Sequence, residues 1–188
     1  MAKETIIVAG LGRCGSSLVM QMLLAAGIPV TGENPAFEDE RVNLPQAANL
    51  WDGEWRGKAV KVLDPHRCEL PAHGAKVIWV SRDERQQALS IAKFWHSVAG
   101  LPYPDRRQRR ALESNLRRDR GVCTAIFLWK GLPLLALRFE DLLADPLRSA
   151  SQIAAFVGTG DPETMAAVVR PRKAECYPGL LEVELLGA

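Results

Sequence analysis

The chain has 188 residues, of which 47% are hydrophobic and 24% are charged, a composition typical of a globular α/β protein with one core. Its net charge of +2 is too small to indicate a nucleic-acid-binding protein. The four cysteines lie far apart and form no C-x-x-C pair, so we expect free thiols, no disulfide framework and no metal site.

The N-terminal segment MAKETIIVAG lacks the long apolar core of a signal peptide. No apolar run approaches the ~18 residues that are needed to cross a bilayer. We therefore expect a soluble, cytoplasmic protein that has no membrane partner.

The first 27 residues predict a strand, a turn and a helix. Residues 5–9, TIIVA, are a short apolar run of the kind found in buried parallel strands. In the following segment, SSLVMQMLLAAG, the apolar residues Leu18, Met22 and Ala25 share one helical face. Gly27 then stands where a helix commonly ends.

Residues 31–57 are polar, contain prolines and show little periodicity, which favours a long binding loop. Residues 58–63, KAVKVL, predict a second strand, and DPHRCELP after it predicts a turn or short helix. Aromatic residues that could line a ligand cleft, with core packing as the alternative, are Phe37, Trp51, Trp55 and Trp95.

In the second half of the chain, predicted strands and helices continue to alternate. Strands are predicted at residues 76–81 and 134–138, and helices at ERQQALSIAKFWH, at 105–130 and at SASQIAAFVG. We therefore predict a single α/β domain over residues 1–188, with a central parallel sheet flanked by helices on both faces. The tail from about residue 171 is expected to be irregular.

The turn after the first strand, GLGRCGSS, predicts an anion site. A glycine turn that leads into a helix exposes backbone N–H groups, and the helix dipole adds to their attraction for phosphate or sulfate. The pattern G-x-G-x-x-G also fits a dinucleotide fold, but the acid expected after a second strand would be Glu33, and the segment before it, IPV, contains a proline. A P-loop kinase would need a lysine where Ser16 stands.

A third interpretation of the loop is a resemblance to a known family. Residues 13–17, RCGSS, resemble the 5′-phosphosulfate loop of sulfotransferases, a basic residue followed by Ser-Gly-Thr-Thr. Family members also carry an arginine after a strand and a serine eight residues later, both of which contact the 3′-phosphate of the donor. Here the strand VIWVS is followed by Arg82, and Ser90 stands eight residues on. An arginine at this end of a parallel strand faces the ligand edge of the sheet, and its planar fork suits phosphate.

Looser similarities extend over residues 5–158. The segment from Lys61, KVLDPHRCELP, is similar to the family's Lys and Asp-Pro-Arg or Lys-Thr-His segment, and LRFEDLLADP is similar to its Arg-Tyr-Glu-Asp-Leu stretch. Arg170, Arg172 and Lys173 stand where some members place a basic segment over the 3′-phosphate and adenine, although exposed tail charges are the commoner explanation for such residues.

The resemblance implies a P-loop NTPase-like three-layer fold and an enzyme that uses 3′-phosphoadenosine 5′-phosphosulfate (PAPS) as its sulfuryl donor. The acceptor would be a hydroxyl or amine of a small molecule or glycan, and the product of the donor would be 3′-phosphoadenosine 5′-phosphate (PAP). Arg13 would stabilise the leaving group, and neither a metal nor nucleic acid is implied. The implied donor-binding residues are Gly12, Arg13, Cys14, Gly15, Ser16, Ser17, Arg82 and Ser90.

The predicted general base is Glu33, because several sulfotransferase families carry a glutamate about 20 residues after the basic loop residue. Glu38 and His66 are the alternatives, since related sequences carry a similar Phe-Glu-Asp stretch or a histidine after the second strand. All three residues could instead be loop residues that face water.

Residues 105–120, DRRQRRALESNLRRDR, hold seven arginines and most simply form a solvated helix face. Steering of an anionic acceptor, such as a sulfated glycan, is the alternative, while the lack of interleaved aromatic residues argues against single-stranded nucleic acid. Two other function classes remain open: a P-loop kinase, and a non-catalytic nucleotide-binding module.

Overall fold

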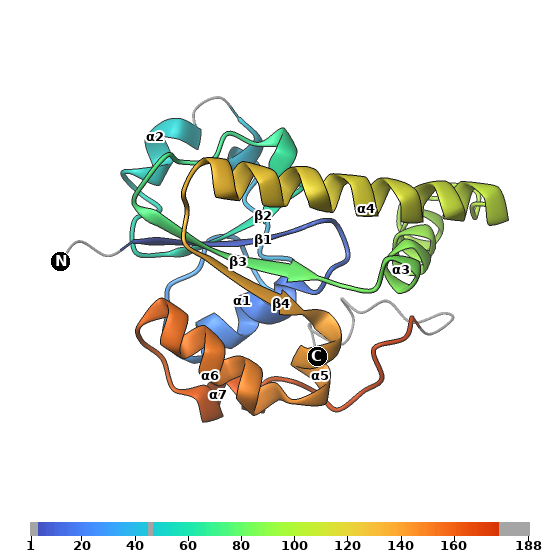
Figure 1. The fold of residues 1–188 in the computed structure, drawn as a ribbon. Coiled ribbons are helices and arrows are strands. Elements are labelled where there is room, and N and C mark those ends of the chain that lie inside the picture. Colours follow the sequence, from blue (N-terminus) through green and yellow to red (C-terminus); the bar gives the residue numbers. More distant parts are fainter. Residues whose placement is uncertain (1–3, 45–46, 177–188) are drawn as a thin grey trace.

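The computed structural model describes residues 4–44 and 47–176. It confirms the predicted α/β architecture with a central parallel sheet (Figure 1). The strand order is β2-β1-β3-β4, and all three neighbouring pairs run parallel. The strands are β1 (Thr5–Gly10), β2 (Ala59–Leu63), β3 (Ala75–Ser81) and β4 (Leu134–Arg138). Because all strands share one direction, their carboxyl ends meet at a single edge of the sheet.

The central strand β1 is buried along its whole length, which explains its uninterrupted apolar sequence. Its side chains alternate between two hydrophobic layers. Val8 joins the layer that contains Leu23 and Ile153, whereas Ile7 joins the layer that contains Trp55 and Phe127. The centre of the sheet is therefore shielded from water on both faces.

Helices cover the two faces of the sheet (Figure 1). One face is covered by α1 (Ser16–Ala25), α6 (Pro146–Val157) and α7 (Pro162–Ala167), and the short α5 (Phe139–Ala144) follows β4 on the same side. The other face is covered by α4 (Arg106–Trp129) and α2 (Ala47–Trp51). The helix α3 (Glu84–Ser97) packs against α4 at the carboxyl edge of the sheet.

Aspartate caps fix where most of these helices begin. The carboxylates of Asp83, Asp105, Asp145 and Asp161 each accept a hydrogen bond from the backbone N–H three residues later, at the starts of α3, α4, α6 and α7. Gly27 and Gly158, with φ of 76° and 86°, follow α1 and α6 as predicted.

The long connection before β2 is more ordered than predicted. It contains the 3₁₀ turn η1 (Glu40–Asn43) and the helix α2, and the turn η2 (Pro65–Arg67) follows β2. Residues 170–176 form neither a helix nor a strand, and the rest of the tail that was predicted to be irregular lies outside the described residues. None of the helices in the described part of the chain is both apolar enough and long enough to cross a membrane.

Candidate functional site

The loop between β1 and α1 depends on two of its three glycines. A Cβ at Gly10 would clash with the Cys14 side chain and lie 2.9 Å from the Val80 carbonyl oxygen. Gly15 has a φ of +103°, and a Cβ there would clash with the ring of Phe139. Gly12, by contrast, has no neighbouring atom within 4 Å of the position of a Cβ. The glycines therefore set the loop's shape at its two ends.

The buried side chain of Gln87, on α3, holds the same loop from behind. Its amide nitrogen donates to the carbonyl oxygens of Leu11 at 3.1 Å and Gly12 at 2.9 Å. Both carbonyls are thus satisfied within the protein, and the loop is tied to the helix that carries Ser90. The sequence signal for Gln87 is weak: a single amide on the apolar face of a predicted helix.

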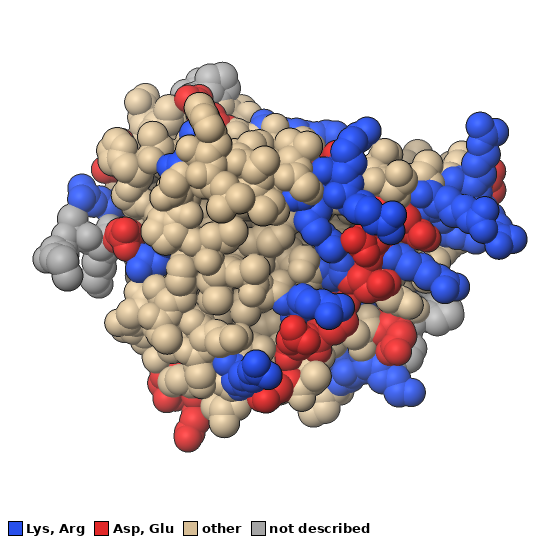
Figure 2. All heavy atoms as spheres, viewed as in Figure 1, with Lys and Arg blue, Asp and Glu red and all other residues tan. Residues whose placement is uncertain are grey.

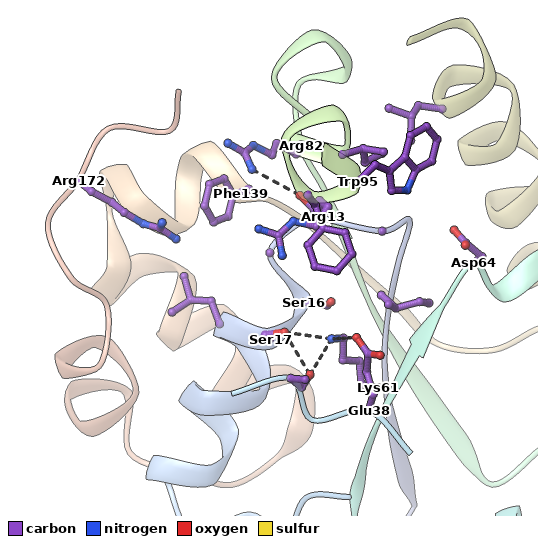
Figure 3. Close-up of a pocket in the computed structure, with 18 residues that line it drawn as sticks. Arg13, Ser16, Ser17, Glu38, Lys61, Asp64, Arg82, Trp95, Phe139 and Arg172 are labelled. Carbon is purple, nitrogen blue, oxygen red and sulfur yellow. Dashed lines mark hydrogen bonds and ion pairs between the residues drawn. The ribbon is translucent and has the colours of Figure 1, made fainter. Parts of the chain in front are cut away.

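A cavity of about 490 Å³ opens at the carboxyl edge of the sheet, beside the N-terminus of α1 (Figure 3). This is the edge at which ligands bind in parallel α/β proteins. The residues that line it come from the loop between β1 and α1, from α1, from the connection before β2, from β2, α3, α4 and α5, and from the segment after α7. The lining residues are Gly12, Arg13, Gly15, Ser16, Ser17, Leu18, Ala36, Glu38, Lys61, Leu63, Asp64, Arg82, Ile91, Phe94, Trp95, Leu116, Phe139 and Arg172.

The two sequence segments that carry the sulfotransferase resemblance meet at this cavity. The Nε–H of Arg13 donates to the Ser90 Oγ at 3.3 Å, and Arg82 Nη1 donates to the Arg13 carbonyl oxygen at 3.4 Å. The Arg13 guanidinium also lies 5.2 Å from the centre of the Phe94 ring. Ser90 is fully buried and does not line the cavity, so the serine contacts Arg13 rather than the open space.

Arg82 is one of three arginines at the same end of the cavity, although it is only 3% exposed. Its Nη2 donates to the Ala174 carbonyl oxygen at 2.7 Å, and Arg120 of α4 donates to the carbonyl of Arg82 at 2.6 Å. The guanidinium groups of Arg82 and Arg172 lie 4.7 Å and 5.3 Å from the ring centre of Phe139. Arg13, Arg82 and Arg172 therefore form a cationic end of the cavity, which we call the arginine end.

Arg170 and Lys173 are exposed and do not line the cavity. Of the basic residues that the sequence places in the tail, Arg172 is thus the one that the structure brings to the site. The Cys176 N–H donates to the Gln86 side chain at 2.9 Å, which anchors this segment to α3.

The buried Lys61 contacts three acceptors on the floor of the cavity. Its Nζ donates to the Ser17 Oγ at 3.0 Å, to the Ala36 carbonyl oxygen at 2.7 Å and to the Glu38 Oε1 at 3.1 Å (Figure 3). The Ser17 hydroxyl in turn donates to the Ala36 carbonyl at 3.2 Å. A lysine that is 6% exposed needs such acceptors to remain charged. In the sequence, Lys61 is visible only as a polar residue inside an apolar strand and in the loose family similarity.

The structure separates the three candidates for the general base. Glu33 is exposed and does not line the cavity, and its backbone carbonyl accepts a hydrogen bond from the Phe37 N–H. His66 also lies outside the lining, with its Nδ1 3.4 Å from the Cys123 Sγ. Glu38 lines the cavity and pairs with Lys61. A further carboxylate, that of Asp64, lines the cavity at the end of β2.

Of the other residues that the sequence predicts for the site, some line the cavity and others are buried in the core. Ser16 and Ser17 line the cavity, whereas the Cys14 thiol is buried beneath the loop, where burial raises its pKa. Among the aromatic candidates, Trp95 lines the cavity. Those that are buried in the core instead are Phe37, Trp51 and Trp55.

The arginine-rich segment forms the first part of α4, where the helix extends beyond the sheet (Figure 1). Figure 2 shows lysine and arginine side chains gathered over this extension. Leu116, on the buried face of α4, reaches the cavity, while Arg120 pairs with Glu84 at 2.9 Å. The basic surface therefore borders the site. The described residues include no group of three or more His, Cys, Asp or Glu side chains that could hold a metal ion.

No protein-family model matches the chain, and no curated protein sequence does. Its structure is nevertheless similar to solved sulfotransferases. Mouse sulfotransferase SULT7A1 complexed with PAP has a TM-score of 0.60 and 16% identity, over 89% of this chain and 65% of that one. Sulfotransferase STF9 from Mycobacterium avium has a TM-score of 0.55 and 12% identity, over 99% and 73% of the two chains.

Retinol dehydratase in complex with androsterone and the inactive cofactor PAP is a third similar structure. Its TM-score is 0.56 and its identity is 16%, over 86% of this chain and 62% of that one. This chain thus spans less than two thirds of the length of the mouse enzyme and of retinol dehydratase.

Proposed function

We propose, from the sulfotransferase fold of this chain, that it is a sulfotransferase that uses PAPS to sulfate a hydroxyl or amine. The observation that carries the proposal is the arginine end of the cavity, where Arg13, Arg82 and Arg172 converge beside the N-terminus of α1. This combination of guanidinium groups and backbone N–H groups suits a ligand with several phosphate or sulfate groups.

The donor would be held by two groups of residues. The first-turn N–H groups of Ser16 and Ser17, together with Arg13, would bind the 5′-phosphosulfate, because a helix N-terminus attracts anions. Arg82 and Arg172 would bind the 3′-phosphate. Ser90 would act through Arg13, by fixing the direction of its guanidinium.

The surroundings of Ser17 favour this donor over ATP–Mg²⁺. In a P-loop kinase the corresponding hydroxyl binds the magnesium ion. Here the Ser17 Oγ accepts from the Lys61 ammonium at 3.0 Å, so a divalent cation at the hydroxyl would be repelled by the neighbouring charge. The same lysine supplies positive charge at a place where a metal-free transferase needs it.

PAPS supplies the sulfuryl group: its bond from sulfur to the bridging phosphate oxygen breaks as a bond from sulfur to the acceptor oxygen or nitrogen forms. Arg13 and Lys61 would stabilise the negative charge that grows on the departing phosphate. A carboxylate would accept the proton of the acceptor. We assign this role to Glu38 ahead of Glu33, because Glu38 lines the cavity.

Calorimetry with PAP and with ATP–Mg²⁺ tests the proposal. We expect PAP to bind in the presence of a chelator, with little change when Mg²⁺ is added, and ATP–Mg²⁺ to bind more weakly. A preference for ATP–Mg²⁺ would instead identify a kinase. If PAP binds, incubation with PAPS and a panel of hydroxyl and amine compounds, followed by mass spectrometry, separates an enzyme from a non-catalytic module.

A further inference from the structure

The lining of the cavity changes in character away from the arginine end. In Figure 3, Asp64 and Trp95 lie on the side of the cavity opposite Arg172. Ile91 stands one turn before Trp95 on α3, Leu116 faces the same space from α4, and Leu63 immediately precedes Asp64. This side, which we call the acidic–apolar end, thus combines a carboxylate with an aromatic ring and aliphatic walls.

The backbone fixes Asp64 in this position. Its N–H donates to the Gly10 carbonyl at 3.0 Å, and its own carbonyl accepts from the Arg67 N–H at 2.8 Å. Its φ and ψ of 51° and 56° are left-handed, a conformation that aspartate tolerates better than most residues. Within the described ranges, the Asp64 carboxylate makes no hydrogen bond or ion pair.

The charged residues around the cavity make its two ends attract ligand groups of opposite charge. Lys61 is paired with Glu38, so the remaining charge of the acidic–apolar end is the negative charge of Asp64. A carboxylate beside apolar walls favours a cationic hydrogen-bond donor, since few water molecules compete for it. Trp95, which is 38% exposed, offers an aromatic face that also attracts a cation.

We propose that the acidic–apolar end is the acceptor subsite, and that it selects molecules with an aromatic or apolar body and an ammonium group. This inference rests on the proposed function, because it names the acceptor class of the same cavity. Asp64 would hold the ammonium, Trp95 would cover it, and Ile91 and Leu116 would contact the apolar body. A sulfated or carboxylated acceptor would be repelled by Asp64, despite the basic surface of α4 outside the cavity.

Three probes of nearly equal size and different charge test the subsite: 2-phenylethylamine, 2-phenylethanol and phenylacetate. Dissociation constants are measured by NMR titration of the full chain, with and without PAP. We expect the amine to bind about tenfold more tightly than the alcohol, and phenylacetate to bind most weakly. Equal binding of amine and alcohol, or a preference for phenylacetate, would overturn the proposal; the latter would point to an anionic acceptor.

Asp64→Asn isolates the carboxylate at constant side-chain size. The variant is expected to abolish the tenfold preference for the amine while the dissociation constant of the alcohol changes less than twofold. Asp52→Asn is the matched control, because Asp52 is exposed and lies outside the cavity lining. An amine preference that survives in Asp64→Asn contradicts the assignment. If that variant does not fold, Trp95→Leu serves instead, with a larger expected loss for the amine than for the alcohol.

The acceptor class and the proposed function fail under different results. If PAP does not bind, the sulfotransferase proposal fails, while the ranking of the probes without nucleotide still reports on Asp64. If PAP binds but the amine is not preferred, only the acceptor class is wrong.

Discussion

The Nε–H of Arg13 donates to the Oγ of Ser90 across 3.3 Å, which joins two positions that are 77 residues apart in the chain. Ser90 is fully buried, so its hydroxyl acts on the arginine and not on the open cavity. The guanidinium of Arg13 is thus held between this hydroxyl and the ring of Phe94. The direction of the loop's only basic side chain depends on α3.

Ser90→Ala should therefore weaken PAP binding through Arg13. Loss of one hydrogen bond of about 0.5–1.5 kcal/mol predicts a two- to tenfold rise in the dissociation constant, measured by calorimetry. In an Arg13→Gln background the same serine change should have almost no further effect. Equal losses in both backgrounds would show that Ser90 acts independently of Arg13.

Arg82→Ala should weaken PAP far more than adenosine 5′-phosphate, since the proposed partner of Arg82 is the 3′-phosphate. Removal of a charged hydrogen-bond donor predicts a loss of about 1.5–3 kcal/mol, or roughly ten- to a hundredfold in affinity. Arg85→Ala is the control, because Arg85 is exposed on α3 and does not line the cavity. Similar losses for both nucleotides would place the 3′-phosphate elsewhere.

Gly15→Ala and Gly12→Ala should differ sharply in stability. At Gly15 the new Cβ clashes with Phe139 and the backbone is left-handed, so we expect the free energy of unfolding to fall by about 1–3 kcal/mol. At Gly12 the Cβ meets no atom within 4 Å, and a change below about 1 kcal/mol is expected. Urea denaturation measures both, and comparable losses would contradict the described loop.

Glu38→Gln should lower turnover more than Glu33→Gln does. Loss of a general base typically costs about 10²–10⁴ in rate, whereas an exposed residue outside the cavity should change it less than about twofold. The readout is PAP released from PAPS with tyramine as acceptor, alongside the dissociation constant of PAP to exclude a defect in donor binding. The reverse ranking would restore Glu33 as the base.

The cysteines should react in an order set by burial. Burial raises the pKa of the Cys14 thiol and raises that of Cys123 to about 11, so at pH 8 only about a thousandth of Cys123 is the reactive thiolate. In the native protein a disulfide reagent such as Ellman's should label the half-buried Cys176 first, and Cys14 and Cys123 only after unfolding. Rapid labelling of all four thiols before unfolding would contradict this order.

The main strands and long helices were predictable because each repeats one pattern over many residues. β1 is an apolar run, β3 contains the apolar run VIWV, and α4 carries a continuous helical pattern. The short helices α2, α5 and α7 were not predicted, since five or six residues give too few turns for a period to emerge. The Asp161-Pro162 pair at the start of α7 is a capping signal that local sequence does offer.

Residues that line the cavity could be predicted only where they belong to a recognisable local motif. Arg13 and Arg82 stand in recognisable segments, and both line the cavity. Lys61 and Asp64 stand in a segment with only a loose family similarity, and they reach the cavity through the order of the strands. Gln87 reaches the loop through the packing of α3, which no local pattern encodes. For the same reason, distance along the chain from Arg13 was a poor guide to Glu33 and Glu38, which lie in a loop whose path depends on tertiary contacts.

The hydrogen bonds from Arg82 to Ala174 and from Cys176 to Gln86 have a practical consequence for expression and assay design. They attach the C-terminal segment to the rim of the cavity, so an affinity tag or fusion partner placed soon after residue 176 would start beside the cavity that we propose for the donor. A tag that precedes Thr5 would emerge at the amino ends of the strands, on the far edge of the sheet. Purification through an N-terminal tag should therefore preserve nucleotide affinity better than a C-terminal one.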